Sequence, residues 1–246
     1  MIDTHAHLDA CADPPDQLVR RAREAGVGTI LTVGTTIEGV RTALELANRH
    51  DEVFAILGIH PHEATDDHDL GALRDLLAHP RAVAVGETGL DFFRDYAPHD
   101  RQRALFRQHL EVAKELGKPV VIHNRAADEA VLEELASFDG TVVLHCFSYP
   151  SAMSAAIERG YYVSFAGNAT YKNASDLRLA ATQVRADRIL IETDAPYLAP
   201  EPLRGRPNEP AHVVHTLEAL ARTRGVGADE LAAQIDENAK RAFGLP

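Results

Sequence analysis

Eight short runs of apolar and β-branched residues, each followed by a segment with helical periodicity, constrain the fold of this chain more than any other feature of its sequence. Strands of a parallel sheet that is covered by helices read as nearly continuous apolar runs, because both of their faces are buried. Parallel neighbours also need a crossover connection, which is usually a helix. The strands are predicted over residues 2–7, 29–34, 53–60, 82–87, 119–123, 140–146, 161–166 and 188–194.

Proline and glycine residues mark where the predicted helices begin and end. Pro14 and Pro15 suit a helix start, and Gly26 follows the amphipathic run as a C-terminal glycine should. Residues 101–116 place their apolar side chains mostly on one face, as an outer barrel helix would. Two closing helices are predicted over 210–223 and 228–241.

Eight alternating strand and helix units predict an α/β protein with a (β/α)8 TIM barrel, and a doubly wound open sheet is the alternative. A dinucleotide-binding fold has no support, because no Gly-x-Gly-x-x-Gly follows a predicted strand. A chain of 246 residues fits one barrel as well as two small domains. Since the sequence shows no repeat, low-complexity tract or linker, we expect residues 1–246 to form a single domain.

Composition argues against several classes of protein. No segment approaches about 18 consecutive apolar residues, and the N-terminus resembles no secretory signal, so we expect neither a membrane span nor secretion. Cys11 and Cys146 form no CxxC or CxxH pattern, which favours a reduced, cytoplasmic setting. The net charge of −12 argues against a duplex-DNA binder with a basic patch. The net charge does not exclude an enzyme that binds nucleic acid through bound metal, because the loaded metal presents positive charge to the substrate.

His5 and His7 lie in the first predicted strand. Side chains two residues apart on a strand point the same way, so the two imidazoles would face one point, which suits a divalent cation. A chain with 13 histidines in 246 residues contains a His-x-His triplet about once by chance, and a second one occurs at His60 and His62. The first triplet gains weight only if later strands bring further ligands to the same place.

The ends of later strands do carry such residues. Active sites of (β/α)8 barrels form at the C-terminal ends of the strands, and six metal-capable side chains on five predicted strands fall there. Four imidazoles and two carboxylates are too many for one tetrahedral zinc and suit two divalent ions, with Glu87 as the expected bridge. Asp194 is expected to bind metal, to act as a general base towards water, or both. The expected metal set is His5, His7, Glu87, His123, His145 and Asp194.

Seven blocks of sequence follow one another over nearly the whole chain. They are Thr-His-Ala-His-Leu-Asp (4–9), Gly-Ile-His-Pro-His (58–62), Gly-Glu-Thr-Gly-Leu-Asp (86–91), Val-Ile-His-Asn-Arg (121–125), His-Cys-Phe-Ser (145–148), Glu-Thr-Asp-Ala-Pro-Tyr-Leu (192–198) and Arg-Gly-Arg-Pro-Asn-Glu-Pro (204–210). Together they resemble the signature blocks of the TatD family of metal-dependent deoxyribonucleases, within the amidohydrolase-like metal hydrolases.

This resemblance implies a TIM barrel whose divalent metal centre hydrolyses phosphodiester bonds, in several members by removing nucleotides from the 3′ ends of single strands. It implies the same six metal ligands, and it suggests that His60, His62 and Arg125 face the substrate phosphate. For Arg125 a surface ion pair is the alternative role. One departure lies beside the site, because Tyr149 stands where the family usually has glycine after Cys-Phe-Ser.

Three smaller expectations concern neighbours of the metal set. Glu192 stands two residues before Asp194, would face the same way, and is expected to orient a ligand. Cys146 alternates away from His145, so buried packing is expected for its side chain. Asn208 is expected to be the N-cap of the helix that follows it.

Aromatic residues make up only 6% of the chain and tryptophan is absent, so no broad stacking platform for single strands is evident. Tyr149, Tyr171 and Tyr197 are available near strand ends, and packing is the role expected for each.

We therefore expect a metal-dependent hydrolase that cleaves phosphodiester bonds of DNA as a 3′ to 5′ exonuclease on single strands, with a metal-activated water as nucleophile. The alternative is hydrolysis of an ester, amide or lactone, including the ester of an aminoacyl-tRNA, at the same site. A lysine on the fourth strand would favour that alternative, and the chain has Glu87 instead. A silent metal- or partner-binding protein would lack a ligand, and none is missing.

The expected cofactors are two divalent ions, with Mg²⁺, Mn²⁺ and Zn²⁺ all open. The expected partner is single-stranded DNA or another nucleic acid. The oligomeric state is open, with a monomer favoured.

Overall fold

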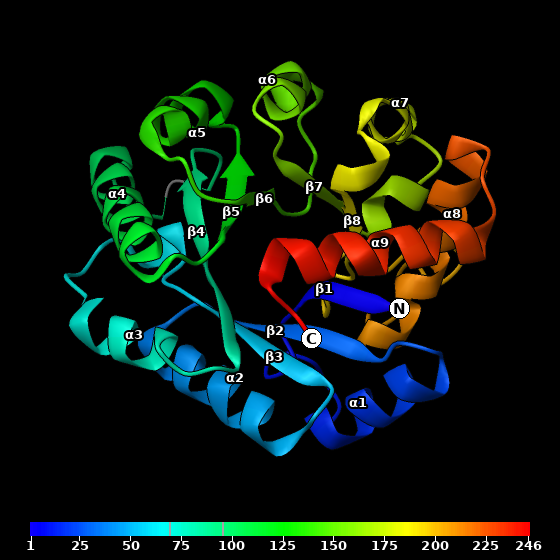
Figure 1. Ribbon diagram of the computed structural model, residues 1–246, viewed down its shortest axis with the longest axis horizontal. Coiled ribbons are helices and arrows are strands. Elements are labelled where there is room, and N and C mark those ends of the chain that lie inside the picture. The colour runs from blue at the N-terminus through cyan, green and yellow to red at the C-terminus, as the bar shows by residue number, and fades with distance from the viewer. Residues whose placement is uncertain (69, 95) are drawn as a thin grey trace.

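All eight predicted strands are present in the computed structural model, which describes residues 1–68, 70–94 and 96–246 (Figure 1). The strands lie side by side in chain order, and every neighbouring pair is parallel. Their bounds are β1 (Ile2–Ala6), β2 (Thr29–Gly34), β3 (Val53–Leu57), β4 (Ala82–Asp91), β5 (Val120–Arg125), β6 (Val142–Leu144), β7 (Tyr162–Phe165) and β8 (Ile189–Ile191).

The ring of strands closes between β1 and the segment that follows β8. The backbone N–H of Asp194 donates to the carbonyl of His5 (2.9 Å), and the N–H of His7 donates to the carbonyl of Ala195 (2.7 Å). Ala6 and Ala195 form a parallel bridge at the same place. The prediction of a (β/α)8 barrel is therefore confirmed, and the open doubly wound sheet is excluded.

The helices surround the barrel on its outside, except for the last one, which crosses one end of it (Figure 1). Their bounds are α1 (Pro15–Glu24), α2 (Ile37–Arg49), α3 (Leu70–Leu77), α4 (His99–Leu116), α5 (Asp128–Glu134), α6 (Met153–Glu158), α7 (Ser175–Gln183), α8 (Val213–Arg224) and α9 (Ala228–Phe243). The first predicted closing helix begins as a 3-10 turn, Pro210–His212, and continues as α8. Within the described residues, none of the helices combines the length and the apolar character that a bilayer crossing requires.

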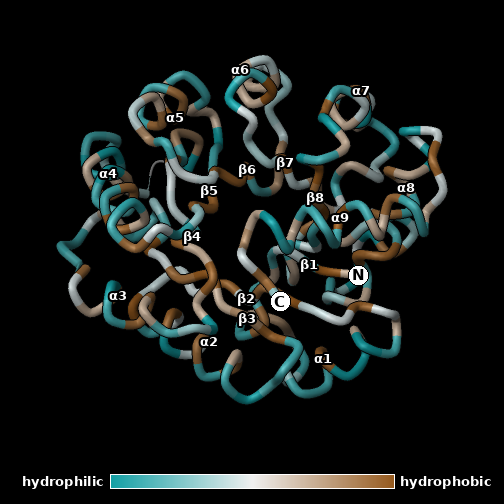
Figure 2. Tube along the Cα trace, in the orientation of Figure 1, coloured by the Kyte–Doolittle hydropathy of each residue, from teal (hydrophilic) through white to brown (hydrophobic). Residues whose placement is uncertain are grey.

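Apolar side chains form two layers, as a parallel barrel requires. The outer layer lies between the strands and the surrounding helices. In Figure 2 the strands are mostly coloured as hydrophobic, whereas the outer sides of the helices are mostly coloured as hydrophilic. The inner layer fills the barrel and includes Leu31, Ile56 and Val121 from the strands. Ala239 and Phe243 of α9 pack against this inner layer at the N-terminal end of the strands. The N-terminal half of the barrel is thus closed by apolar packing, and polar side chains are left for the C-terminal end.

Several strand ends differ from the prediction in ways that matter for the site. β4 continues to Asp91, beyond the predicted end at residue 87, whereas β3, β6 and β8 stop before His60, His145 and Asp194 respectively. These three residues therefore lie in the loops that follow the strands. A strand can be extended or cut short without a change in its apolar pattern, so the pattern alone does not set these ends.

The expectation of buried packing for Cys146 is wrong. β6 ends at Leu144, and Cys146 has a φ of 44°, so strand alternation no longer applies to it. Cys146 is a free cysteine of intermediate exposure, and it lines the pocket at the C-terminal end of the barrel.

Candidate metal centre

The six residues of the expected metal set converge on one pocket of about 820 Å³ at the C-terminal end of the barrel. Five of them line the pocket directly, and His5 lies beneath it with no exposed surface. Their side chains come from β1, β4, β5 and the loops after β1, β6 and β8. Segments separated by most of the chain thus contribute to a single site because they are neighbours around the ring.

Atoms of the types that can bind metal form three overlapping groups in this pocket, and the members of each group lie within 4.8 Å of one another. The first two groups share His5, and the first and third share Glu87. The groups are His5, Glu87 and His145; His5, His7 and Asp194; and His60, Glu87 and His123.

The two carboxylate oxygens of Glu87 face different partners. Oε2 lies 3.5 Å from Nε2 of His5 and 3.8 Å from Nε2 of His7. Oε1 lies 2.7 Å from Nδ1 of His123 and 3.0 Å from Nε2 of His145. A carboxylate with ligand-type atoms on both sides has the arrangement that a bridge between two cations requires.

The spacing of His5 and His7 fits ligands of a common ion. Their Nε2 atoms are 3.3 Å apart, and two nitrogens bound tetrahedrally at about 2.1 Å from zinc would be about 3.4 Å apart. Two neutral imidazoles that both present a lone pair at this distance gain nothing from each other, and a divalent cation held by both nitrogens would compensate for that. The donor set of imidazoles and carboxylates therefore fits divalent metal.

Two carboxylates outside the metal set fix the rings of two histidines. Nδ1 of His145 lies 3.0 Å from Oε1 of Glu192, and Nε2 of His123 lies 3.2 Å from Oδ2 of Asp91. When these nitrogens donate their protons to the carboxylates, the opposite nitrogen of each ring is left as a lone pair facing Glu87 and the pocket. The expected orienting contact of Glu192 is present.

Asp91 is the residue that inspection of the sequence missed. It is completely buried at the end of β4, and its Oδ2 also lies 2.8 Å from Nε2 of His62. Burial would raise the pKa of Asp91, but hydrogen bonds from His123, the Arg94 backbone and His62 hold it far below its usual range. The sequence does contain a pattern that predicts this position. Asp91 follows Glu87 at a spacing of four residues, so its side chain lies on the same side as that of Glu87 if the strand continues.

His60 is placed as a proton donor. Its Nδ1 accepts the backbone N–H of His62 (3.2 Å), so the neutral ring carries its proton on Nε2. Burial lowers the pKa of His60 to about 4, which keeps the ring neutral at pH 7. Nε2 lies 3.5 Å from Oε1 of Glu87. A ring with this tautomer offers an N–H, not a lone pair, to whatever occupies the pocket.

The other two expected substrate contacts also lie at the pocket. His62 is held against Asp91, as described above, and Arg125 is the last residue of β5. The guanidinium carbon of Arg125 lies 4.2 Å from the ring centre of Phe93. Among the described residues no carboxylate forms an ion pair with Arg125, so the alternative role as a surface ion pair has no support.

Electrostatics keep Glu87 ionised. Burial alone would raise its pKa, but the imidazoles of His145 and His60 and hydrogen bonds from His123 and His145 hold the pKa well below the usual range. The same pocket has the opposite effect on Cys146, because burial together with Asp194 and Glu192 raises the pKa of the thiol well above its usual value. The thiol is therefore protonated and a poor nucleophile.

Asn208 is not an N-cap, contrary to expectation. Its Nδ2 donates to the carbonyl of Thr193 (2.9 Å) and to the carbonyl of Tyr197, on either side of Asp194. The side chain is buried at 2% exposure. Its local contact is with the backbone N–H of Glu209, one residue on, and no side chain caps the turn that begins at Pro210. Asn208 thus fixes the loop that carries Asp194.

The three tyrosines near strand ends behave differently. Tyr171 packs under the guanidinium of Arg204 (4.2 Å), and Tyr149 is partly buried at the pocket wall. For Tyr197 the packing expectation is wrong, because its side chain is 57% exposed at the mouth of the pocket.

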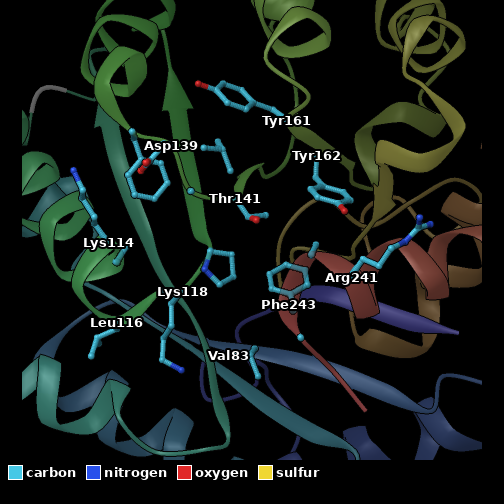
Figure 3. Close-up of a pocket in the computed structure, with 18 of the residues that line it drawn as sticks. Val83, Lys114, Leu116, Lys118, Asp139, Thr141, Tyr161, Tyr162, Arg241 and Phe243 are labelled. Atoms are coloured by element: carbon cyan, nitrogen blue, oxygen red, sulfur yellow. The ribbon is translucent and has the colours of Figure 1, made fainter.

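A second hollow, of about 840 Å³, lies at the opposite end of β4 to β8, beside the end of α9 (Figure 3). Lys114, Lys118 and Arg241 surround it, but their charged ends extend away from its centre. None of the three metal-capable groups found among the described residues lies there. The groups suited to metal chemistry are therefore concentrated at the C-terminal end.

Known proteins resemble the chain over its whole length. Residues 2–244 match the family described as TatD related DNase. A Mycobacterium tuberculosis protein described as an uncharacterized metal-dependent hydrolase TatD is 40% identical over 260 residues, covering 100% of this chain and 98% of that protein. A Shigella flexneri protein described as a 3′-5′ ssDNA/RNA exonuclease TatD is 37% identical over 245 residues, covering 94% of this chain and 93% of that protein.

A solved structure agrees. YjjV, a TatD homolog from Escherichia coli K12, superimposes with a TM-score of 0.94 at 32% identity, covering 100% of this chain and 98% of that one.

Proposed function

This chain belongs to the TatD family of metal-dependent hydrolases, and from that premise we propose that it removes nucleotides from the 3′ end of single-stranded nucleic acid by hydrolysing phosphodiester bonds. The observation that supports this most is the position of Glu87, whose two oxygens face separate groups of imidazoles. Paired cations about 3.5–4 Å apart suit displacement at phosphorus, because they stabilise both the attacking and the leaving oxygen.

We assign the metal ligands to the six residues expected from the sequence, with two divalent ions between them. When bound, such ions supply Lewis acidity towards a phosphoryl oxygen and lower the pKa of water. The assigned ligands are His5, His7, Glu87, His123, His145 and Asp194. The imidazole majority favours Zn²⁺ or Mn²⁺ over Mg²⁺, which prefers oxygen ligands.

The remaining roles belong to side chains at the pocket. The carboxylate of Asp194 is kept ionised, because His7 and the neighbouring imidazoles lower its pKa against the effect of burial, so it can accept a proton from water. Nε2–H of His60 donates to a phosphate oxygen, and Arg125 offers its planar fork to another. The phosphate thus meets donors on one side and a proton acceptor on the other.

The test is degradation of a 5′-labelled single-stranded oligonucleotide by metal-stripped protein to which Mg²⁺, Mn²⁺ or Zn²⁺ is returned. We expect stepwise shortening from the 3′ end with at least one ion, and loss of shortening in Glu87→Ala and Asp194→Ala. Asp176→Ala, an exposed carboxylate at the start of α7, is the matched control and should behave as the unaltered protein.

Absence of shortening with every ion, in protein that binds metal, would refute the nuclease proposal. The same preparations would then be assayed on carboxylic esters, amides and lactones, which are the alternative substrates for this site.

A further inference from the structure

Exposed aromatic side chains gather at the mouth of the metal centre. Phe93, Tyr96 and Tyr197 are 63%, 58% and 57% exposed, and all three lie in loops at the C-terminal ends of β4 or β8. The other exposed large apolar side chains of the described residues are aliphatic and lie elsewhere: Ile157, Leu179 and Val226. A set of exposed rings confined to one mouth indicates a binding surface.

Two of these rings stand on opposite sides of the pocket. Tyr197 follows β8 and contacts His7, with ring centres 5.8 Å apart and planes at 74°. Tyr96 follows β4 and contacts His62, with ring centres 4.7 Å apart and planes at 83°. An edge-to-face contact with a histidine positions each tyrosine, and the exposed remainder of the ring is available to another flat group. β4 and β8 are four strands apart in the ring of eight.

The two sides also differ in charge. Arg94 and Arg125 line the pocket beside Tyr96, and no carboxylate of the described residues pairs with their guanidinium groups. Asp9 lines the pocket on the Tyr197 side. On the Tyr96 side the two guanidinium groups outnumber the one exposed carboxylate of the described lining, Glu63, which is next to His62. The buried Asp91 on that side is already bonded to His62 and His123. Phosphates beyond the reacting one are therefore favoured on the Tyr96 side.

We propose that Tyr197 stacks on the 3′-terminal base and Tyr96 on the next base, so that the strand crosses the metal centre from the acidic side to the basic side. This inference rests on the proposed function. A 3′-terminal nucleoside carries no phosphate beyond the one being cleaved, so it suits the side with Asp9. The rest of the strand brings one phosphate per nucleotide and suits the side with Arg94 and Arg125. Both tyrosines are positioning residues for the substrate.

The test uses 5′-labelled oligonucleotides with one abasic nucleotide, at the 3′ end or next to it, and measures KM and kcat for the first cleavage. In the unaltered protein each missing base should raise KM about 5- to 100-fold. In Tyr197→Ala the KM for intact strand should already be raised, and removing the terminal base should add nothing, while removing the next base still does. Tyr96→Ala should show the reverse.

Controls separate stacking from structural damage. Tyr197→Phe and Tyr96→Phe keep the ring and should retain the KM of the unaltered protein. Leu179→Ala removes a side chain of similar exposure (60%) on α7 and should change neither KM nor its dependence on the bases. If both alanine variants respond to both missing bases as the unaltered protein does, the stacking inference is overturned while the nuclease activity stands. An unaltered protein that cleaves none of the strands refutes the proposed function itself.

The direction in which the strand crosses the site is tested separately. A 3′-phosphate on the terminal nucleotide places charge near Asp9 and should slow the first cleavage, and Asp9→Asn should reduce that penalty. Arg125→Gln should lower the slope of log KM against log salt concentration by about 1, because one phosphate contact is lost. A 3′-phosphate that speeds cleavage would reverse the assigned direction of the strand.

Discussion

At the scale of single residues, one carboxylate oxygen of Asp91 orients two histidines of the site. Asp91→Asn should keep the local turn, because Oδ1 can still accept the backbone N–H groups of Phe93 and Arg94. The neutral amide no longer holds the proton of His123 Nε2, and we expect metal affinity to fall about 10- to 100-fold. Competition with a chromophoric chelator measures this.

The control for Asp91→Asn is Asp100→Asn, at the exposed start of α4. Unchanged metal affinity in Asp91→Asn, with a folded protein by circular dichroism, would show that Asp91 does not act through the histidines.

His109 gives a prediction for stability against pH. It is buried in α4, its Nε2 accepts the backbone N–H of Ile59 (3.0 Å), and burial lowers its pKa to about 4. In the unfolded chain His109 takes up a proton near pH 6.5. The contribution of its neutral, buried ring to the free energy of unfolding is therefore fully present above that pH and is lost as the pH falls towards 4. The free energy of unfolding should lose up to about 3 kcal/mol over this range because of His109.

Urea unfolding of the unaltered protein and of His109→Gln at several pH values between 7 and 4 measures this contribution of His109 to the free energy of unfolding. The difference between the two unfolding free energies should shrink as the pH is lowered. Two curves that stay parallel would mean that the ring is not held neutral in the folded state.

At the scale of elements, α9 closes the N-terminal end of the barrel. Phe243 is 4% exposed and packs into the inner apolar layer with residues of the strands. Phe243→Ala should cost about 3–5 kcal/mol of unfolding free energy, whereas Phe243→Leu should cost less because the cavity is smaller. Urea unfolding gives both values.

The proposed metal centre lies at the other end of the strands, so the Phe243→Ala protein that remains folded should keep its metal affinity. A loss of metal affinity as large as that of Asp91→Asn would show that α9 controls the geometry of the site.

At the scale of the whole molecule, the assigned ligands connect five strands or their following loops around the ring. Metal that binds only the folded chain stabilises it by about 2.7 kcal/mol at a concentration of 100 times Kd. For a protein of this size that corresponds to a rise in Tm of roughly 5–10 °C. Differential scanning calorimetry with added metal, and after chelation, measures the shift.

Asp194→Asn should remove most of this rise in Tm, and Asp176→Asn should leave it intact. A rise of equal size in both variants would place the stabilising metal elsewhere on the molecule.

The barrel and the residues that gather at its rim can be predicted from local patterns in the sequence. Apolar runs and the helices between them are local patterns, and the rule that sites form at strand ends turned those patterns into a set of residues. His5, His123 and Asp194 were found this way, because each stands at or just beyond the end of an apolar run.

The contacts that hold the loops at that rim depend on long-range packing and could not be predicted from the sequence. β4 reaches Asp91 where the side chain of Gln102, from α4, bonds both the N–H and the carbonyl of that residue. Asn208 fixes the loop around Asp194 by bonding the carbonyl of Thr193, 15 residues away in the chain. These contacts join segments that are separate in sequence, so no local pattern records them. The exposure of the Tyr96 ring also depends on contacts between segments that are separate in sequence. Its partner His62 lies in the loop that follows β3, the neighbouring strand.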